Sequence, residues 1–349
     1  MLGLAEALEH GTLRVPFSGL LTGAWQLAMA RALRRHLCWP AHVRVIAIGG
    51  ATLGGSGKTP LAIACAAELA RLGVPTALVG HAHRGVPRFA RVVTEDDALE
   101  EVGDEALVAA RALRGSAARV IVGPTRQAAI DLAARVARVL VVDGVSQTAP
   151  VAASLALLAV DAVEPWGFRR ALPPRGDLRA RPSDLLDVCD AVVAVGDPPD
   201  PTSAEWCGIP TKPDVWVARV TGAGARLASG ELVSWEALSR APLGLITALA
   251  RPDRVLRSLG ARGARPSLVL RSNDHGPLSA DLARRASRAA REVGIALWLA
   301  TPKCSFHVSR AVEGAGAARD LLGAPYATLE HELVLSAPLV ARLRQLAAP

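Results

Sequence analysis

The sequence predicts an α/β fold in which helices cover a parallel sheet, joined to a second, smaller α/β domain. Apolar segments typical of buried strands alternate with helix-like segments from residue 43 onward. A glycine-rich loop separates the first of these strands from the helix that follows it. The chain has 349 residues, 51% of them hydrophobic, which is enough for two domains with cores of their own.

The first domain is expected to alternate strands and helices. Each predicted strand is a short apolar run that ends in glycine, and these runs cover residues 43–50, 75–80, 118–123 and 137–144. The segments between them have helical periodicity, at residues 59–73, within 95–115 and at 125–136. A further strand with a proline-rich exit is expected at 192–201.

The second half of the chain restarts the pattern after a predicted hairpin at residues 215–235. Strand, loop and helix follow at 243–260, and two more strand ends are expected within 266–279 and 295–304. We therefore divide the chain into an N-terminal membrane-facing helical segment, a nucleotide-binding domain, a hairpin linker and a C-terminal α/β domain, at residues 1–40, 41–215, 216–235 and 236–349.

Residues 17–33 form an apolar segment that is followed by Arg34 and Arg35. The segment is short for a bilayer span and contains the polar Gln26. An amphipathic helix in the membrane interface fits it better, with Trp25 at headgroup level and the two arginines on lipid phosphates. The alternative is a helix that packs on its own domain.

Composition narrows the classes of partner. A net charge of +8 favours anionic partners such as lipid headgroups or phosphorylated substrates, although an arginine-rich solvated surface would give the same count. Tyr326 is the only tyrosine, and no stripe combines basic and aromatic residues, so no nucleic acid is expected. The five cysteines lack metal-ligand spacing, and the first residues lack a signal-peptide pattern, which favours a reducing compartment.

The loop at residues 49–60 reads GGATLGGSGKTP and connects a predicted strand to a predicted helix. In this context its glycines let backbone N–H groups point at phosphates. A lysine after the loop reaches the β- and γ-phosphates, and the next hydroxyl binds Mg²⁺. The general pattern has a glycine where Thr52 stands. We predict a P-loop NTPase-like site for ATP and Mg²⁺ that contains Thr52, Gly54, Gly55, Ser56, Gly57, Lys58 and Thr59.

Asp143 is the natural partner of this loop. It ends the apolar run at 137–144, which predicts a carboxylate at the same edge of the sheet as the loop. In P-loop enzymes such a carboxylate holds Mg²⁺ directly or through water.

Five segments follow one another in the order of a known family's motifs. They are TLGGSGKTP (52–60), VGDEALVAARAL (102–113), ALPPRGDLRARPSDL (171–185), ITALARPDRV (246–255) and NDHGPLS (273–279). The chain resembles tetraacyldisaccharide 4′-kinase, the lipid A 4′-kinase of Gram-negative bacteria, whose loop also carries Thr in place of the first Gly. The collinear matches extend over most of residues 17–310.

This resemblance implies a peripheral kinase on the cytoplasmic face of the inner membrane. Its reaction would transfer the γ-phosphate of ATP to the 4′-hydroxyl of a lipid-linked tetraacyldisaccharide 1-phosphate. Asp104 matches the family's base, His275 the histidine that pairs with it, and Glu105 a residue near the metal. Arg179 matches a position suited to a substrate phosphate. Asp104 also suits a helix N-cap, and His275 an ordinary loop histidine.

Several residues depart from the family pattern. Where the family has DDGxQH, the chain reads VDGVSQT, with Val142 for the first Asp and Gln147 near the expected His. The segment GHAHRG replaces SRGYG, and Cys304 replaces an expected Asp. These changes keep two alternatives open: a catalytically impaired homologue that binds nucleotide or lipid, or another P-loop ATPase.

Overall fold

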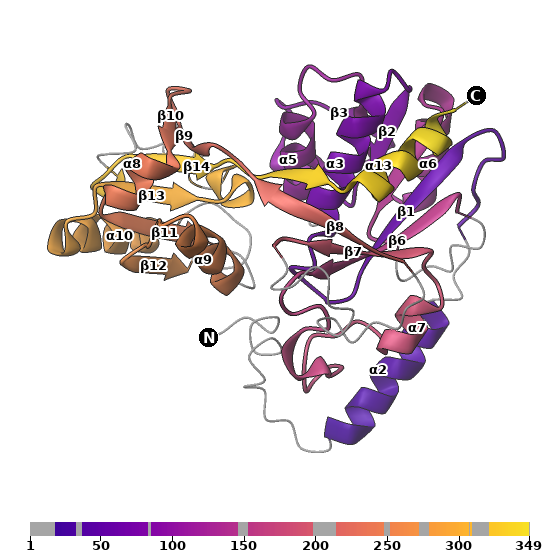
Figure 1. Cartoon of the computed structure of the whole chain (residues 1–349), viewed down its shortest axis with the longest axis horizontal. Helices are drawn as coiled ribbons and strands as arrows, with labels where there is room; N and C mark the ends of the chain where they lie inside the picture. The colour runs from indigo at the N-terminus through magenta and orange to yellow at the C-terminus, as the bar shows by residue number, and fades with distance from the viewer. Residues whose placement is uncertain are drawn as a thin grey trace. The chain divides into compact units, whose positions relative to one another are not determined.

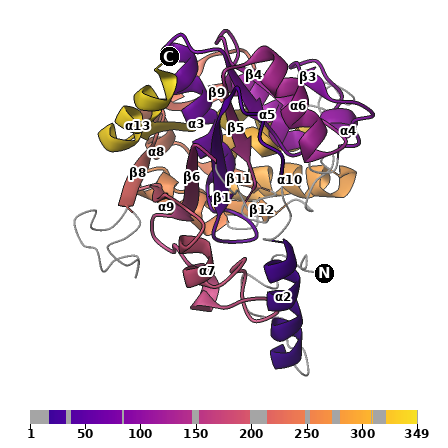
Figure 2. The same cartoon turned by 90° about the vertical axis from the view of Figure 1, so that its right-hand side faces the viewer.

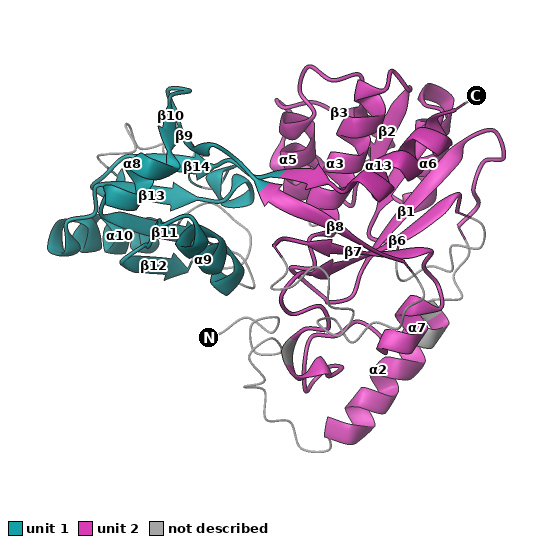
Figure 3. Ribbon diagram, in the orientation of Figure 1, with its two compact units in different colours: residues 1–6, 221–332 teal, residues 7–220, 333–349 magenta. Residues whose placement is uncertain are grey.

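The computed structural model describes residues 18–32, 37–82, 85–145, 153–197, 214–247, 252–271, 279–306, 308 and 321–348. The chain divides into two compact units, coloured separately in Figure 3. The larger unit comprises residues 7–220 and 333–349, and the smaller one includes residues 221–332.

The larger unit is built on a nine-stranded sheet with the order β15-β8-β7-β6-β1-β5-β2-β4-β3 (Figure 1). The pairings from β8 to β4 are all parallel, and β3 joins β4 antiparallel. The strands are β1 Arg44–Gly50, β2 Thr76–Val79, β3 Arg91–Val93, β4 Arg119–Val122, β5 Val139–Asp143, β6 Leu155–Asp161, β7 Ala191–Val195, β8 Asp214–Thr221 and β15 Glu332–Leu335. The predicted fold class is confirmed by this mostly parallel, helix-covered sheet.

Helices cover both faces of the large sheet. Alanines of α6 pack on one face with alternate residues of β1, β2 and β5. Helix α3 packs on β1, β2 and β5 and also contacts α5 and α13; Figure 2 shows α13 beside α3. The helices of this unit are α2 Ser18–Ala32, α3 Lys58–Arg71, α4 Leu99–Val102, α5 Asp104–Ala112, α6 Arg126–Val136, α7 Pro182–Leu186 and α13 Ala337–Ala347, with the 3₁₀ turn η1 Phe168–Arg170.

The smaller unit has a six-stranded sheet with the order β10-β9-β14-β13-β11-β12. Two hydrophobic cores form on it, one with α10 and one with α8 and α9. Its strands are β9 Gly224–Leu227, β10 Leu232–Ser234, β11 Leu243–Thr247, β12 Leu268–Arg271, β13 Leu297–Ala300 and β14 Tyr326–Leu329. Its helices are α8 Trp235–Arg240, α9 Pro252–Ala261 and α10 Ala280–Val293.

The structure differs from the sequence expectation at several places. Strand β6, directly beside β1, was not predicted. Strand β8 pairs in parallel with β7 in the large sheet, so the hairpin consists of β9 and β10 alone. The C-terminal residues 333–349 belong to the larger unit, because Leu339, Leu343 and Leu346 of α13 are buried there.

Candidate active site

The glycine-rich loop connects β1 to α3 and folds back over the end of β1. A Cβ atom on Gly50 would lie 2.2 Å from Ser56 Oγ and 2.9 Å from Lys58 Cδ, so this close approach requires glycine. Gly57 caps α3 in the left-handed conformation, with φ of 80°, which glycine adopts at little cost. The loop therefore presents Lys58 and Thr59 in the first turn of α3, where helix N–H groups favour an anion.

Thr59 and Asp143 meet as the sequence predicts. The Thr59 hydroxyl donates a hydrogen bond of 2.6 Å to Asp143 Oδ2. Asp143 is the last residue of β5 and is buried, and its second oxygen, Oδ1, accepts no hydrogen bond. A buried carboxylate oxygen next to a hydroxyl is a suitable ligand pair for Mg²⁺.

Among the described residues, no group of three or more His, Cys, Asp and Glu side chains gathers as a metal site. A P-loop site does not need such a group, because phosphate oxygens and water supply the remaining Mg²⁺ ligands. Thr59 and Asp143 therefore fit the predicted metal, whereas an all-protein metal cage is not found in this part of the chain.

Sequence reasoning missed Arg126, the first residue of α6. Its Nη1 donates to the carbonyl oxygens of Val79 and Gly80, at 3.4 and 3.2 Å. Burial lowers the pKa of Arg126, and the carboxylates of Asp143 and Glu105 oppose this shift by raising it. The guanidinium thus neutralises part of the negative charge at this edge of the sheet. Its position at a predicted helix start, after a strand, was the available signal.

Arg179 lies against the glycine-rich loop. Its backbone N–H donates to Ala51 O at 2.8 Å, and its Nη2 lies 3.4 Å from the carbonyl oxygens of Thr52 and Leu53. Burial lowers the pKa of Arg179, while Asp143 raises it. Its buried Nε has no hydrogen-bond partner, which leaves one donor for an anionic ligand.

Asp104 and Glu105 begin helix α5, as the sequence predicts for an acidic helix start. Asp104 is buried, and its Oδ1 accepts the backbone N–H of Glu105 at 2.8 Å. The N-cap of α5 is Gly103, so Asp104 is the first residue of the helix and not its N-cap, although a carboxylate in this first turn still stabilises the helix N-terminus. The hydrogen bond from Glu105 occupies one oxygen of the Asp104 carboxylate. Gly103, which precedes Asp104, has φ of 83°.

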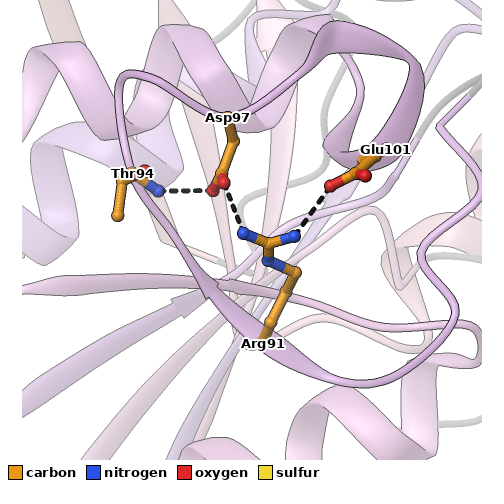
Figure 4. A network of polar contacts seen from close by, with 4 residues as sticks. All are labelled: Arg91, Thr94, Asp97 and Glu101. Carbon is orange, nitrogen blue, oxygen red and sulfur yellow. Dashed lines mark hydrogen bonds and ion pairs between the residues drawn. The ribbon is translucent and has the colours of Figure 1, made fainter.

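An ion-pair network fixes the turn that leads to Asp104 (Figure 4). Arg91 of β3 bridges Asp97 and Glu101, with 2.8 Å between Arg91 Nη1 and Glu101 Oε2. Asp97 also accepts the backbone N–H of Thr94 at 2.8 Å. The segment between β3 and α5 is therefore bonded to Arg91 of the sheet at two points, Asp97 and Glu101.

Gly85 supports the same turn from the neighbouring loop. A Cβ atom there would lie 2.6 Å from Gly103 N and 2.9 Å from Glu101 O, both backbone atoms that cannot rotate away. Val86 N also donates to Glu100 O at 3.0 Å. Gly85 belongs to GHAHRG, the segment that departs from the family's SRGYG, yet the glycine at this contact is present.

Replacing Gly85 by alanine is expected to displace the start of α5. A misplacement of about 1 Å costs on the order of 10²-fold in rate, and forcing a clash in a packed site costs about 1–3 kcal/mol of stability. We expect kcat to fall with nucleotide affinity retained, measured by steady-state transfer and by direct ATP binding. Gly260→Ala is the matched control, since among the described residues no atom beyond its chain neighbours and its own helix backbone lies within 4 Å of the added Cβ. An unchanged kcat in Gly85→Ala would contradict this role.

Val142 does not occupy the metal-facing side of β5. Its side chain is fully buried in the cluster formed with α6, which includes Ala129 and Ile130. Adjacent strand residues point to opposite faces, so Asp143 faces the loop and Val142 faces away from it. The change at Val142 therefore leaves the Thr59–Asp143 pair intact. Gln147 and His275 lie outside the described residues.

Comparison with known proteins decides the family. A family model described as tetraacyldisaccharide-1-P 4′-kinase matches residues 11–346. The chain belongs to this family. A tetraacyldisaccharide 4′-kinase of Rhodospirillum centenum is 32% identical over 285 residues, covering 80% of each chain. One of Hyphomonas neptunium is 30% identical over 270 residues, covering 75% of this chain and 74% of the relative.

The fold of the family is also found in a solved structure. The crystal structure of LpxK from Aquifex aeolicus in complex with ATP has a TM-score of 0.62 with this chain at 18% sequence identity. The similarity covers 95% of this chain and 98% of the other. The predicted tetraacyldisaccharide 4′-kinase resemblance is confirmed, and the P-loop arrangement described above is the family fold.

Proposed function

We propose that this protein is an ATP-dependent lipid kinase of lipid A biosynthesis that phosphorylates the 4′-hydroxyl of a tetraacyldisaccharide 1-phosphate. The family match over residues 11–346 supports the reaction and the acceptor class. The observation that carries the proposal is the intact nucleotide end of the site: the loop, Lys58 at its exit, and Thr59 bonded to Asp143 at 2.6 Å.

Binding of the triphosphate follows from the loop. Backbone N–H groups of residues 54–59 cradle the phosphates, and the Lys58 ammonium lies near the β- and γ-phosphates. Thr59 and Asp143 would hold Mg²⁺, with Glu105 on the same side of the site. When bound, Mg²⁺ neutralises charge on the phosphates. The spare N–H of Arg179 would contact a substrate phosphate.

The acceptor hydroxyl needs a base, because a sugar hydroxyl is a weak nucleophile. We assign this role to Asp104, with His275 as the residue that pairs with it. The 4′-oxygen attacks the γ-phosphorus, the bond to the β,γ-bridging oxygen breaks, and Asp104 accepts the hydroxyl proton. ADP and the 4′-phosphorylated lipid are the products. Arg126 balances the negative charge of Glu105 and Asp143 near the transferred group.

A membrane surface would present the lipid acceptor. Within the described residues, no helix combines the length and apolarity that crossing a bilayer requires. Helix α2 instead leaves Leu20 and Leu27 exposed, at 75% and 54%, while its other side contacts the protein. We propose that these leucines contact the cytoplasmic face of the inner membrane as a peripheral attachment.

The test is transfer of labelled γ-phosphate from MgATP to tetraacyldisaccharide 1-phosphate in detergent micelles, with Lys58→Ala as the blank. We expect labelled lipid that depends on both the acceptor and Lys58. ATP binding without labelled lipid would instead favour an impaired homologue or a different acceptor. Hydrolysis that no lipid stimulates would favour a general P-loop ATPase.

A further inference from the structure

Residues 171–181, which we call the strap, are bonded to the glycine-rich loop through residues 177–179. Leu53 N donates to Asp177 O at 2.9 Å, and Arg179 N donates to Ala51 O at 2.8 Å. Between these two bonds, Thr52 and Leu178 form an isolated antiparallel bridge. The strap is therefore a short β-like partner of loop residues 51–53.

The other side of the strap is fastened to helix α2. Four side chains of α2 make one hydrogen bond each to the strap, at 2.9–3.1 Å. Thr22 donates to Pro173 O and Trp25 Nε1 donates to Arg179 O. The remaining two contacts join Arg175 to Ser18 and Arg181 to Gln26. Figure 1 shows α2 and the neighbouring α7 below the large sheet.

The two sets of contacts converge on Arg179. Its N–H binds Ala51, its guanidinium reaches the carbonyl oxygens of Thr52 and Leu53, and its own carbonyl accepts the Trp25 indole N–H. Trp25 is half-buried and packs against the core that contains Ala51 and Leu178. The sequence led us to expect this ring at lipid headgroup level; in the structure its indole N–H is bonded to Arg179, the residue that supports the loop.

We propose that Trp25 is a positioning residue for nucleotide binding, acting through Arg179 and the strap on the phosphate loop. This proposal rests on the proposed function, because it assumes that the loop binds ATP. Glycines 54, 55 and 57 give the loop wide conformational freedom. When only a fraction of molecules hold the loop in the conformation that binds ATP, the apparent affinity for ATP is reduced by that fraction. The strap restricts that freedom from outside the loop.

Trp25→Phe removes the hydrogen bond and keeps an aromatic ring against the core, at the cost of the smaller volume of phenylalanine. Loss of one hydrogen bond predicts a rise of about 2- to 12-fold in the ATP dissociation constant. Direct binding of a fluorescent ATP analogue measures this without acceptor or turnover, so the result does not depend on whether lipid transfer occurs. We expect KM for ATP to rise by a similar factor, with little change in KM for the lipid.

Two controls separate this role from others. Leu27→Ala changes an exposed residue of the same helix, and we expect weaker binding to anionic phospholipid vesicles with unchanged ATP affinity. Thr22→Val removes a second contact to the strap while keeping the side-chain shape, and we expect a smaller rise in the ATP dissociation constant. It tests the proposal independently if Trp25→Phe does not fold.

The proposal is overturned by unchanged ATP affinity in a folded Trp25→Phe variant. If vesicle binding then falls, Trp25 contacts lipid; if only the melting temperature falls, Trp25 serves packing alone. If Trp25→Phe does not fold, unchanged ATP affinity in Thr22→Val has the same consequence. Weaker ATP binding by Trp25→Phe and by Thr22→Val, with vesicle binding retained, supports it.

Discussion

Replacing Lys58 by alanine is expected to lower the rate of phosphoryl transfer by at least about 10²–10³-fold, the loss typical when one fixed charge or donor is removed from a transition state. Lys58 opens α3 directly after the loop, and its side chain packs over Gly50. Removing the ammonium takes away the cation that the phosphate loop supplies to the charge developing on the transferred phosphate. The measurement is kcat/KM for transfer from MgATP to the lipid acceptor.

Lys58→Arg makes the same prediction sharper. Lys58 Cδ lies so close to Gly50 that a Cβ atom there would come within 2.9 Å of it, so one side of this side chain is already in contact with the loop. A planar guanidinium is broader than an ammonium, and we expect Lys58→Arg to stay strongly impaired although its charge is kept. Arg71→Ala, an exposed cation at the far end of α3, is the control that should keep full activity. Substantial activity in Lys58→Ala would contradict the assigned phosphate contact.

Local patterns predicted the nucleotide end of the site because its residues are close in sequence. The loop, its glycines and the first turn of α3 occupy adjacent positions, and Asp143 needed only the expectation that parallel strands end at one edge. The Thr59–Asp143 bond shows that this expectation is correct. The strap could not be found in this way, since its bonds to the loop join residues that are far apart in sequence.

The missed elements have similar explanations. Strand β6 reads LALLAVD, and a short run of Leu and Ala does not distinguish a buried strand from a helix. Residues 333–347 follow the smaller unit in sequence, but β15 and α13 complete the larger one. Whether the chain returns to an earlier sheet depends on tertiary contacts. The hydrophobic periodicity of the returning segment gives no information about those contacts. Arg126 was missed because arginine is common in this chain and its carboxylate partners lie elsewhere.

Asp104→Asn is expected to lower kcat by about 10²–10⁴-fold, the usual contribution of a general base, and to leave ATP affinity nearly unchanged. This substitution distinguishes the two readings of Asp104. Its Oδ1 accepts the N–H of Glu105 in the first turn of α5, and an asparagine oxygen accepts the same hydrogen bond. The helix start is therefore retained, apart from about 0.3–1 kcal/mol of charge–dipole energy, while the group that accepts the proton is lost.

The comparison with Asp104→Ala completes the argument, because alanine removes the base and the hydrogen bond together. If Asp104 is the base, Asn and Ala variants have similarly low kcat and only the Ala variant melts at clearly lower temperature. If Asp104 only stabilises the helix start, Asn keeps near-normal kcat and Ala alone is impaired. Asp131→Asn, an exposed acid on α6, controls for the loss of one negative charge. Because the Asn variant keeps the fold, its kcat reports on the chemistry of the carboxylate itself.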